Sequence, residues 1–181
     1  MIRRLLSLHL LLAISLLAGP LWAGEHGQSR ANYQLGPGDK LSILVFNQDD
    51  MSGEYTVNGS GGFIMPFIEG IQAEGLTIAE LADVIIDKLK PAYLLNPRVS
   101  VEVLNFRPYY IIGEINSSGS YPYVESMTFL NAVAIAGGFS YRAKKKYVLV
   151  KREDSDGKEV KLDINGVVMP GDIIRVKERL F

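Results

Sequence analysis

Pairs of neighbouring carboxylates are the closest approach to catalytic chemistry in this 181-residue sequence. Asp49 and Asp50 are adjacent in one polar segment, and Asp154 and Asp156 lie two positions apart in another. Such pairs can bind a cation or serve as general acid and base. Both segments are predicted loops, however, and the simpler interpretation of loop carboxylates is solvated charge. We favour that interpretation.

The residue types on which most enzymes depend are scarce. The chain has no cysteine and two histidines, His9 in the N-terminal apolar segment and His26 shortly after it. This composition offers no cysteine nucleophile, no Cys/His metal cluster and no convincing Ser-His-Asp arrangement. The glycine-rich stretch 59–62 lacks the lysine and the following helix of a phosphate-binding loop. We therefore expect no enzymatic activity, no cofactor and no metal.

Two clusters have the chemistry to contact a glycan. Aromatic rings can stack on sugar rings, and basic side chains attract anionic polymers or lipid headgroups. Each cluster also has a structural explanation, which we favour: rings that pack across a hairpin, and charges that protect an edge strand. The residues are Tyr109, Tyr110, Tyr121 and Tyr123 in one predicted hairpin, and Arg142, Lys144, Lys145, Lys146, Lys151 and Arg152 around one predicted strand.

The N-terminus has the pattern of a secretory signal peptide. Arg3 and Arg4 precede an apolar run that is shorter than the roughly 20 residues of a spanning helix. A small-residue cleavage site follows at Ala23, so we predict a signal peptide over 1–23 and a flexible tail over 24–31. Cleavage would leave 17 basic against 20 acidic residues, a net charge of about −3. That balance argues against nucleic-acid binding.

The first strand is predicted over 40–46, directly after a tight turn at Pro37-Gly38. Its apolar residues occupy both faces. A strand of this kind is usually buried on both sides or covered by a neighbouring subunit, and the sequence leaves both alternatives open. The two sets are Leu41, Ile43 and Val45 on one face, and Leu44 and Phe46 on the other.

A hairpin, a helix and a second strand complete the first half of the chain. Two short strands are predicted around a glycine-rich hairpin at 58–62. Thr77 and Glu80 have capping-box spacing at the start of a helix that Pro91 ends. Valines then alternate with polar residues over 99–103, which indicates a half-buried strand. This order predicts a small α+β sandwich.

Arg107-Pro108 marks a predicted boundary, after which strands and one helix recur. The helix over 128–136 ends at Gly137-Gly138, a natural C-cap. Pro-Gly-Asp at 37–39 returns at 170–172, again just before an apolar run. We interpret both as turns that enter a strand in separate domains. The remaining predicted strands cover 109–115, 121–124, 146–152, 160–164 and 173–178.

The order of these segments resembles the outer-membrane polysaccharide export (Wza-like) family. The matching phrases are "YQLGPGDKLSILVF", "LTIAELADVIIDKL", "NPRVSVEVLNF", "MTFLNAVAIAGGF" and "PGDIIRV". The resemblance implies an α+β chain: a small sandwich, the polysaccharide export domain, over 32–106, then a β-grasp-like soluble-ligand-binding (SLBB) domain over 107–181. It assigns structural roles to Pro37, Gly38, Asp39, Pro66, Asn96, Pro97, Gly113, Gly137, Gly138, Pro170, Gly171 and Asp172.

Three departures from the family pattern refine this expectation. The sequence stops at Phe181, without the amphipathic helix that forms an outer-membrane barrel in larger members. It has no cysteine to accept a lipid. Gly61 stands where similar proteins usually have aspartate. The first two departures lead us to expect a short periplasmic component that relies on a separate outer-membrane barrel protein.

The resemblance implies a function and partners. Family members form homo-oligomeric rings that carry capsular polysaccharide or exopolysaccharide outward as a passive conduit. They are associated with the outer membrane and coupled to an inner-membrane co-polymerase, often with a tyrosine kinase module. We expect the same of this chain, with polysaccharide as cargo and no nucleic acid. A monomeric periplasmic glycan-binding module and a glycan-modifying enzyme are the alternatives.

Overall fold

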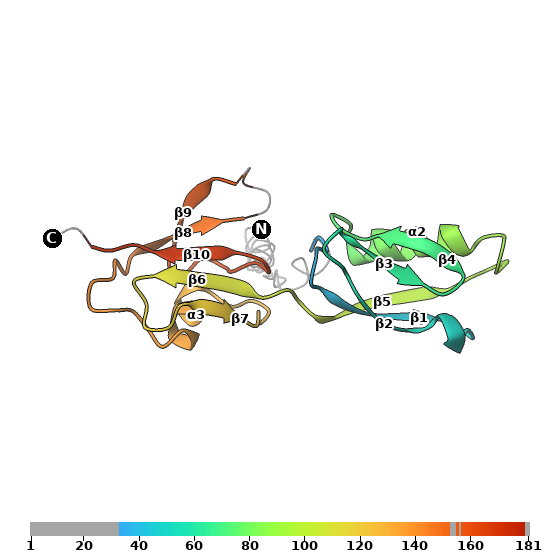
Figure 1. Cartoon of the computed structure of the whole chain (residues 1–181), viewed down its shortest axis with the longest axis horizontal. Helices are drawn as coiled ribbons and strands as arrows, with labels where there is room; N and C mark the ends of the chain where they lie inside the picture. The colour runs from blue at the N-terminus through green and yellow to red at the C-terminus, as the bar shows by residue number, and fades with distance from the viewer. Residues whose placement is uncertain (1–32, 153–154, 156, 180–181) are drawn as a thin grey trace, which may run out of the picture. The chain divides into compact units, whose positions relative to one another are not determined.

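The computed structural model describes residues 33–152, 155 and 157–179. The predicted signal peptide and tail, with His9 and His26, lie outside these residues, as do Asp154 and Asp156. The described part of the chain has two α-helices and ten strands, and the strands form three sheets (Figure 1). The predicted α+β class is confirmed.

The first sheet has three antiparallel strands with β1 in the middle. A 3-10 turn follows β1, and one helix packs on the same core as the sheet. The elements are β1 (Lys40–Val45), β2 (Gly53–Thr56), β5 (Val99–Asn105), η2 (Asp49–Met51) and α2 (Ile78–Leu89).

Strand β1 is buried on one face alone. Leu41, Ile43 and Val45 are at most 1% exposed, because they point into the core shared with α2. Leu44 and Phe46 point to the other face and are 53% and 57% exposed. Burial on both faces within the described chain is therefore wrong, and a cover from another subunit stays a proposal.

Helix α2 forms as its sequence predicts. The Thr77 hydroxyl accepts a hydrogen bond from the Glu80 backbone N–H, and the Glu80 carboxylate accepts one from the Thr77 N–H at 2.8 Å. Leu81, Ile85 and Leu89 recur at helical spacing and are fully buried. Local capping and an apolar stripe thus fix both the start and the orientation of this helix.

The hairpin in this region lies between β3 (Gly62–Met65) and β4 (Ile68–Gln72), and not at 58–62 as predicted. Strand β3 pairs with β4, whereas β2 pairs with β1. The segment 58–62 instead crosses between sheets, in a turn where the Asn58 side chain accepts hydrogen bonds from the backbone N–H of Ser60 and Gly62. Strand β4 has no clean apolar alternation, which is why the sequence pattern missed it.

The second half of the chain has its own core around a mixed sheet. The last strand, β10, lies between β6, to which it runs parallel, and β8, to which it runs antiparallel. The predicted strand at 121–124 is shifted, since Pro122 has no N–H to donate to a ladder. In sheet order the strands are β7 (Gly119–Tyr121), β6 (Tyr109–Gly113), β10 (Ile173–Val176), β8 (Tyr147–Lys151) and β9 (Glu159–Asp163).

Helix α3 (Phe129–Ile135) packs its buried residues into this second core. A capping box from Thr128 and Asn131 begins the helix. The Gly138 N–H donates to the Val133 carbonyl at 2.8 Å, and both Gly137 and Gly138 have positive φ. The predicted helix with its glycine C-cap is confirmed in this position.

The two Pro-Gly-Asp phrases form the same turn. In each, the aspartate N–H donates to the carbonyl three residues earlier, Asp39 to Gly36 and Asp172 to Met169, both at 3.1 Å. The intervening glycines have φ of 96° and 84°, as a type II turn requires. Each carboxylate also accepts the N–H three residues earlier, at 2.8 Å from Gly36 and 2.9 Å from Met169.

Both aspartates are fully buried, and each lies beside an arginine. Asp172 accepts from Arg152 through Nε at 2.9 Å and Nη2 at 3.1 Å. Asp39 accepts from the Tyr33 hydroxyl at 2.6 Å and from the Arg107 N–H at 2.7 Å, with the Arg107 guanidinium 3.6 Å away. Burial of a carboxylate costs free energy that such partners offset, so the turn and its arginine form one unit.

We predict that Asp172→Ala lowers the free energy of unfolding by about 3 kcal/mol, because it leaves the Arg152 Nε–H and the Met169 N–H without their acceptor. Urea denaturation followed by circular dichroism measures the loss. Glu159→Gln is the matched control, since Glu159 forms an exposed ion pair with Arg175. That change should stay within about 0.5 kcal/mol. Equal losses in the two variants would contradict the prediction.

Candidate functional site

The four tyrosines of the predicted glycan contact do not share one surface. Tyr109 and Tyr121 face each other across β6 and β7, with ring centroids 5.9 Å apart and Tyr109 fully buried. Tyr110 points to the opposite face of the sheet and is 44% exposed. Tyr123 packs edge-on against Phe106 at 5.3 Å. Packing explains three of these rings, and Tyr110 alone offers an open aromatic surface.

The Tyr109 hydroxyl is buried without a hydrogen-bond partner among the described residues. Burial raises the pKa of Tyr109 to about 12, and the nearby Tyr121 phenol adds to the shift. A phenol in this setting is held neutral at physiological pH. It contributes ring packing rather than a polar contact.

The basic residues have also acquired structural partners. Arg152 is the partner of the buried Asp172, and Arg142 forms an ion pair with Glu178. Strand β8 lies between β10 and β9 rather than at the edge of the sheet. Our interpretation of these charges as protection for an edge strand is therefore wrong for β8, because both of its ladders are already paired.

The lysines of this segment surround aromatic rings. Lys144 lies over the Tyr147 ring at 5.2 Å, and Lys145 lies over the Phe139 ring at 5.9 Å. These are cation–π distances. Lys146 and Lys151 are exposed. The segment remains a cationic surface, although the structure does not gather it with the tyrosines into one pocket.

The family-motif residues mark backbone positions rather than a chemical centre. Pro66 begins the two-residue turn between β3 and β4, where Phe67 has a φ of 68°. Gly113 has a φ of 97°, and a Cβ there would collide with the Val176 carbonyl. Glycine is the residue that tolerates both constraints. Gly61 likewise has positive φ, and a Cβ there would meet the Glu74 side chain.

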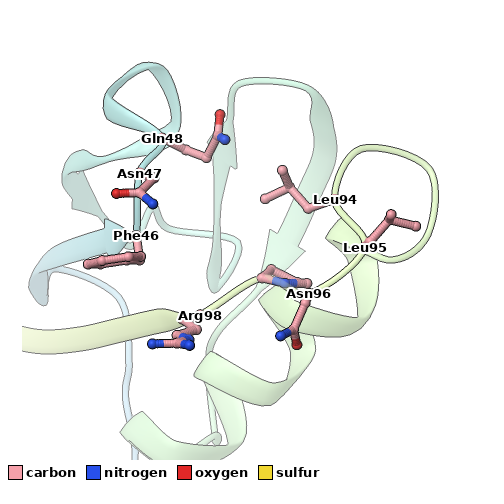
Figure 2. Close-up of a pocket in the computed structure, with 8 residues that line it drawn as sticks. Phe46, Asn47, Gln48, Leu94, Leu95, Asn96 and Arg98 are labelled. Atoms are coloured by element: carbon pink, nitrogen blue, oxygen red, sulfur yellow. The ribbon is translucent and has the colours of Figure 1, made fainter.

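One pocket of about 280 Å³ lies where the end of β1 meets the segment that leads into β5. Figure 2 shows the two segments on either side of it, residues 46–48 on one and 94–98 on the other. It is lined by Phe46, Asn47, Gln48, Leu94, Leu95, Asn96, Pro97 and Arg98.

Backbone hydrogen bonds hold both walls of the pocket. The Ser52 hydroxyl accepts from the Val45 N–H at 3.0 Å and donates to the Gln48 carbonyl at 2.8 Å. The Phe46 N–H donates to the Arg98 carbonyl at 2.9 Å, which continues the pairing of β1 with β5. The Leu94 N–H donates to the carbonyl of Leu89, the last residue of α2. The walls are thus fixed by the ends of regular elements.

The polar side chains of this pocket are not used by the fold. In residues 33–152, 155 and 157–179, no hydrogen bond involves the side-chain amides of Asn47, Gln48 or Asn96. Arg98 lies over the Phe46 ring at 5.7 Å. The pocket therefore combines an aromatic ring, three amides and one guanidinium, which is chemistry for binding a polar ligand.

Sequence reasoning named three of the eight residues that line this pocket, without bringing them together. Asn96 and Pro97 were taken as structural motif residues, and Phe46 as part of a strand. The missed signal was antiparallel pairing: if β1 and β5 are neighbours, the end of one lies beside the start of the other. The polar residues of 47–48 and 96–98 would then have been expected on one rim.

The described residues contain no group of three or more His, Cys, Asp or Glu side chains arranged to hold a metal. Asp49 and Asp50 are exposed in η2, next to the pocket in sequence. In the same part of the chain, neither helix has the length and apolar character needed to cross a bilayer.

Comparison with known proteins identifies the family. Residues 27–104, which include both walls of the pocket, match the family described as polysaccharide biosynthesis/export protein. The chain is 34% identical over 137 residues to the exopolysaccharide production protein ExoF of Rhizobium meliloti (strain 1021). It is 26% identical over 137 residues to the polysialic acid transport protein KpsD of Escherichia coli.

The chain belongs to the polysaccharide export family. The aligned region covers 69% of this chain and 32% of ExoF, and 74% of this chain and 24% of KpsD. The chain thus spans about a third or less of the length of these curated relatives. Family membership, as predicted from the order of the sequence motifs, is confirmed.

We predict that Tyr109→Phe is at least as stable as the parent at neutral pH, because it removes a buried hydroxyl that has no partner in the described structure. Urea midpoints near pH 7 measure this. Tyr110→Phe, at an exposed ring of the same strand, is the control and should change little.

The same variant tests the raised pKa. Folding favours the neutral Tyr109 phenol, so its contribution to stability is complete below the unfolded pKa near 10 and is lost as pH rises through about 12. Parent protein should therefore lose more stability than Tyr109→Phe between about pH 9 and pH 12. Parallel losses would show that this phenol is not the titrating group.

Proposed function

We propose that this chain takes part in polysaccharide export as the repeating subunit of a periplasmic, outer-membrane-associated ring. In this proposal the polymer passes through the ring without any bond being made or broken by the protein. The observation that carries the proposal is the family match over residues 27–104, together with relatives named for exopolysaccharide production and polysialic acid transport.

The structure supports an assembly through its uncovered apolar surface. Leu44 lies exposed on the outer side of β1. Tyr110, Ile112 and Ile173 lie exposed on neighbouring central strands of the second sheet, on the face opposite its core. Contiguous apolar side chains on an open sheet face favour a protein partner. A heterologous contact that closes on itself gives a ring, and a lumen requires several copies.

The topology supports the domain assignment that we propose, an export domain over 32–106 and an SLBB domain over 107–181. The two halves have separate cores. In the second, the first and last strands are parallel neighbours at the centre of a mixed sheet with one helix, as in a β-grasp fold. We further propose an inner-membrane co-polymerase with its tyrosine kinase module and a separate outer-membrane barrel protein as partners.

Deletion of the gene tests the proposed function. We expect surface and secreted polysaccharide to fall strongly and periplasmic polymer to rise, and a plasmid copy to restore export. Quantification of total sugar in the medium, on the cells and in the periplasm measures this. A normal coat with unchanged secretion would overturn the proposal. Normal secretion with poor retention of polymer would favour the glycan-binding module instead.

A second test addresses the ring. Ile173→Asp places a charge on the open face of the second sheet, where we expect it to abolish oligomers that are detected by in-cell cross-linking and by native mass measurement of envelope extracts. Val160→Asp is the control, because Val160 is similarly exposed on the edge strand β9 of the same sheet but faces the other side. Both variants are first checked for folding by circular dichroism. Identical oligomers in both would contradict this choice of surface.

A further inference from the structure

We propose that the pocket between residues 46–48 and 94–98 is a binding subsite for one sugar unit of the polymer. This inference deepens the proposed function and rests on it. It assigns recognition to a site outside the tyrosine and lysine clusters that the sequence suggested.

Phe46 supplies an apolar platform. Its ring is 57% exposed at the end of β1, although it lies directly beside the pocket (Figure 2). The Arg98 guanidinium lies 5.7 Å from its centroid and so limits the orientations that both side chains can take. A sugar ring has an apolar C–H face, and a flat exposed aromatic ring is the surface on which such a face can be buried.

The side-chain amides of the pocket can form hydrogen bonds with the hydroxyl groups of a sugar. Each hydroxyl both donates and accepts, and an Asn or Gln side chain offers both a carbonyl oxygen and an NH₂ group. Asn47, Gln48 and Asn96 line the pocket, and their amides make no hydrogen bond within the described chain. Arg98 adds donors and forms no ion pair with any described residue. The three amides can bind a ligand without breaking a hydrogen bond of the fold.

The pocket is largely pre-formed. Ser52 fixes the turn after β1 through the Val45 N–H and the Gln48 carbonyl. Asn47 has a φ of 59°, a left-handed conformation that asparagine tolerates better than most residues and that tends to occur at functional positions. A rigid wall lowers the entropic cost of binding, because fewer groups need to be ordered when the ligand arrives.

Size and charge narrow the ligand class. A volume of about 280 Å³ lies near the lower end of ligand pockets, which suits one sugar unit rather than a long segment. Arg98 is the one charged residue that lines the pocket, and Asp49 and Asp50 follow Gln48 in sequence. This balance does not select for a strongly anionic ligand, so a neutral, hydroxyl-rich sugar is the occupant that we propose.

A second copy of the chain is the competing occupant, since Leu95 at the rim is highly exposed. An apolar side chain inserted from another subunit would bury three amides and a guanidinium without partners. Each buried polar group left unpaired costs free energy of binding. The polar lining therefore favours a sugar over an apolar protein contact.

Nuclear magnetic resonance titration of the purified full chain tests the proposal. The probes are oligosaccharides prepared by partial hydrolysis of the polymer that the producing cells secrete, separated into neutral and acidic fractions. We expect amide shifts to cluster at 46–48 and 94–98 on addition of the neutral fraction, with millimolar or tighter binding. Spectra at several protein concentrations without sugar report on self-association at the same residues.

Two variants and one matched control localise the effect. Phe46→Ala removes the ring, and Asn47→Gly removes an amide while it keeps the positive φ. Each should weaken binding by about tenfold, the change expected from about 1.4 kcal/mol. Phe67→Ala is the control, because Phe67 is 56% exposed, close to the 57% of Phe46, but lies outside the pocket. It should bind as the parent does.

Three outcomes would overturn the proposal: no shifts at millimolar sugar, shifts away from the pocket, or shifts at the pocket that follow protein concentration alone. The last would assign the pocket to a second copy. These failures are distinct from failure of the proposed function, which the gene deletion tests separately. If the deletion strain fails to export polymer but the purified protein binds no sugar at this pocket, the export role stands and the subsite is refuted.

Discussion

The burial of a carboxylate inside a tight turn is the constraint on which both halves of this protein depend. Asp39 and Asp172 are fully buried, and each is satisfied by a backbone N–H of its own turn and by groups distant in sequence. Loss of any one partner leaves a buried polar group unsatisfied, which costs stability. The two turns therefore connect the start of β1 to Arg107 and the start of β10 to Arg152.

Local signals in the sequence predicted local structure well. Thr77 with Glu80 predicted the start of one described helix and Gly137-Gly138 the end of the other, because capping involves residues within a single turn of helix. Pairing between strands was less accessible. The stretch 58–62 looks like a hairpin, yet β2 and β3 belong to different sheets, since β2 takes its partner from β1 and β3 from β4. Partner choice depends on packing distant in sequence, which a short window does not contain.

The candidate site shows the same limit. Its lining residues come from two segments, 46–48 and 94–98, that meet through the pairing of β1 with β5. From residue type alone, the predicted glycan contacts were tyrosines and lysines, whose side chains are largely engaged in packing and ring contacts. Tyr109 shows why composition misleads: its ring has the chemistry of a sugar contact and is fully buried. Burial is decided by tertiary structure, and it determines which side chains remain available to a ligand.

The position of β10 in the second sheet has a consequence for biogenesis. Among the described strands it is the last in sequence, yet it lies in the middle of the sheet, between β6 and β8. Until it arrives, the earlier strands can form two separate hairpins, β6 with β7 and β8 with β9, with no ladder that joins them. The five-stranded sheet therefore cannot be completed until residue 176 has been made, and before then the two hairpins have unpaired edges.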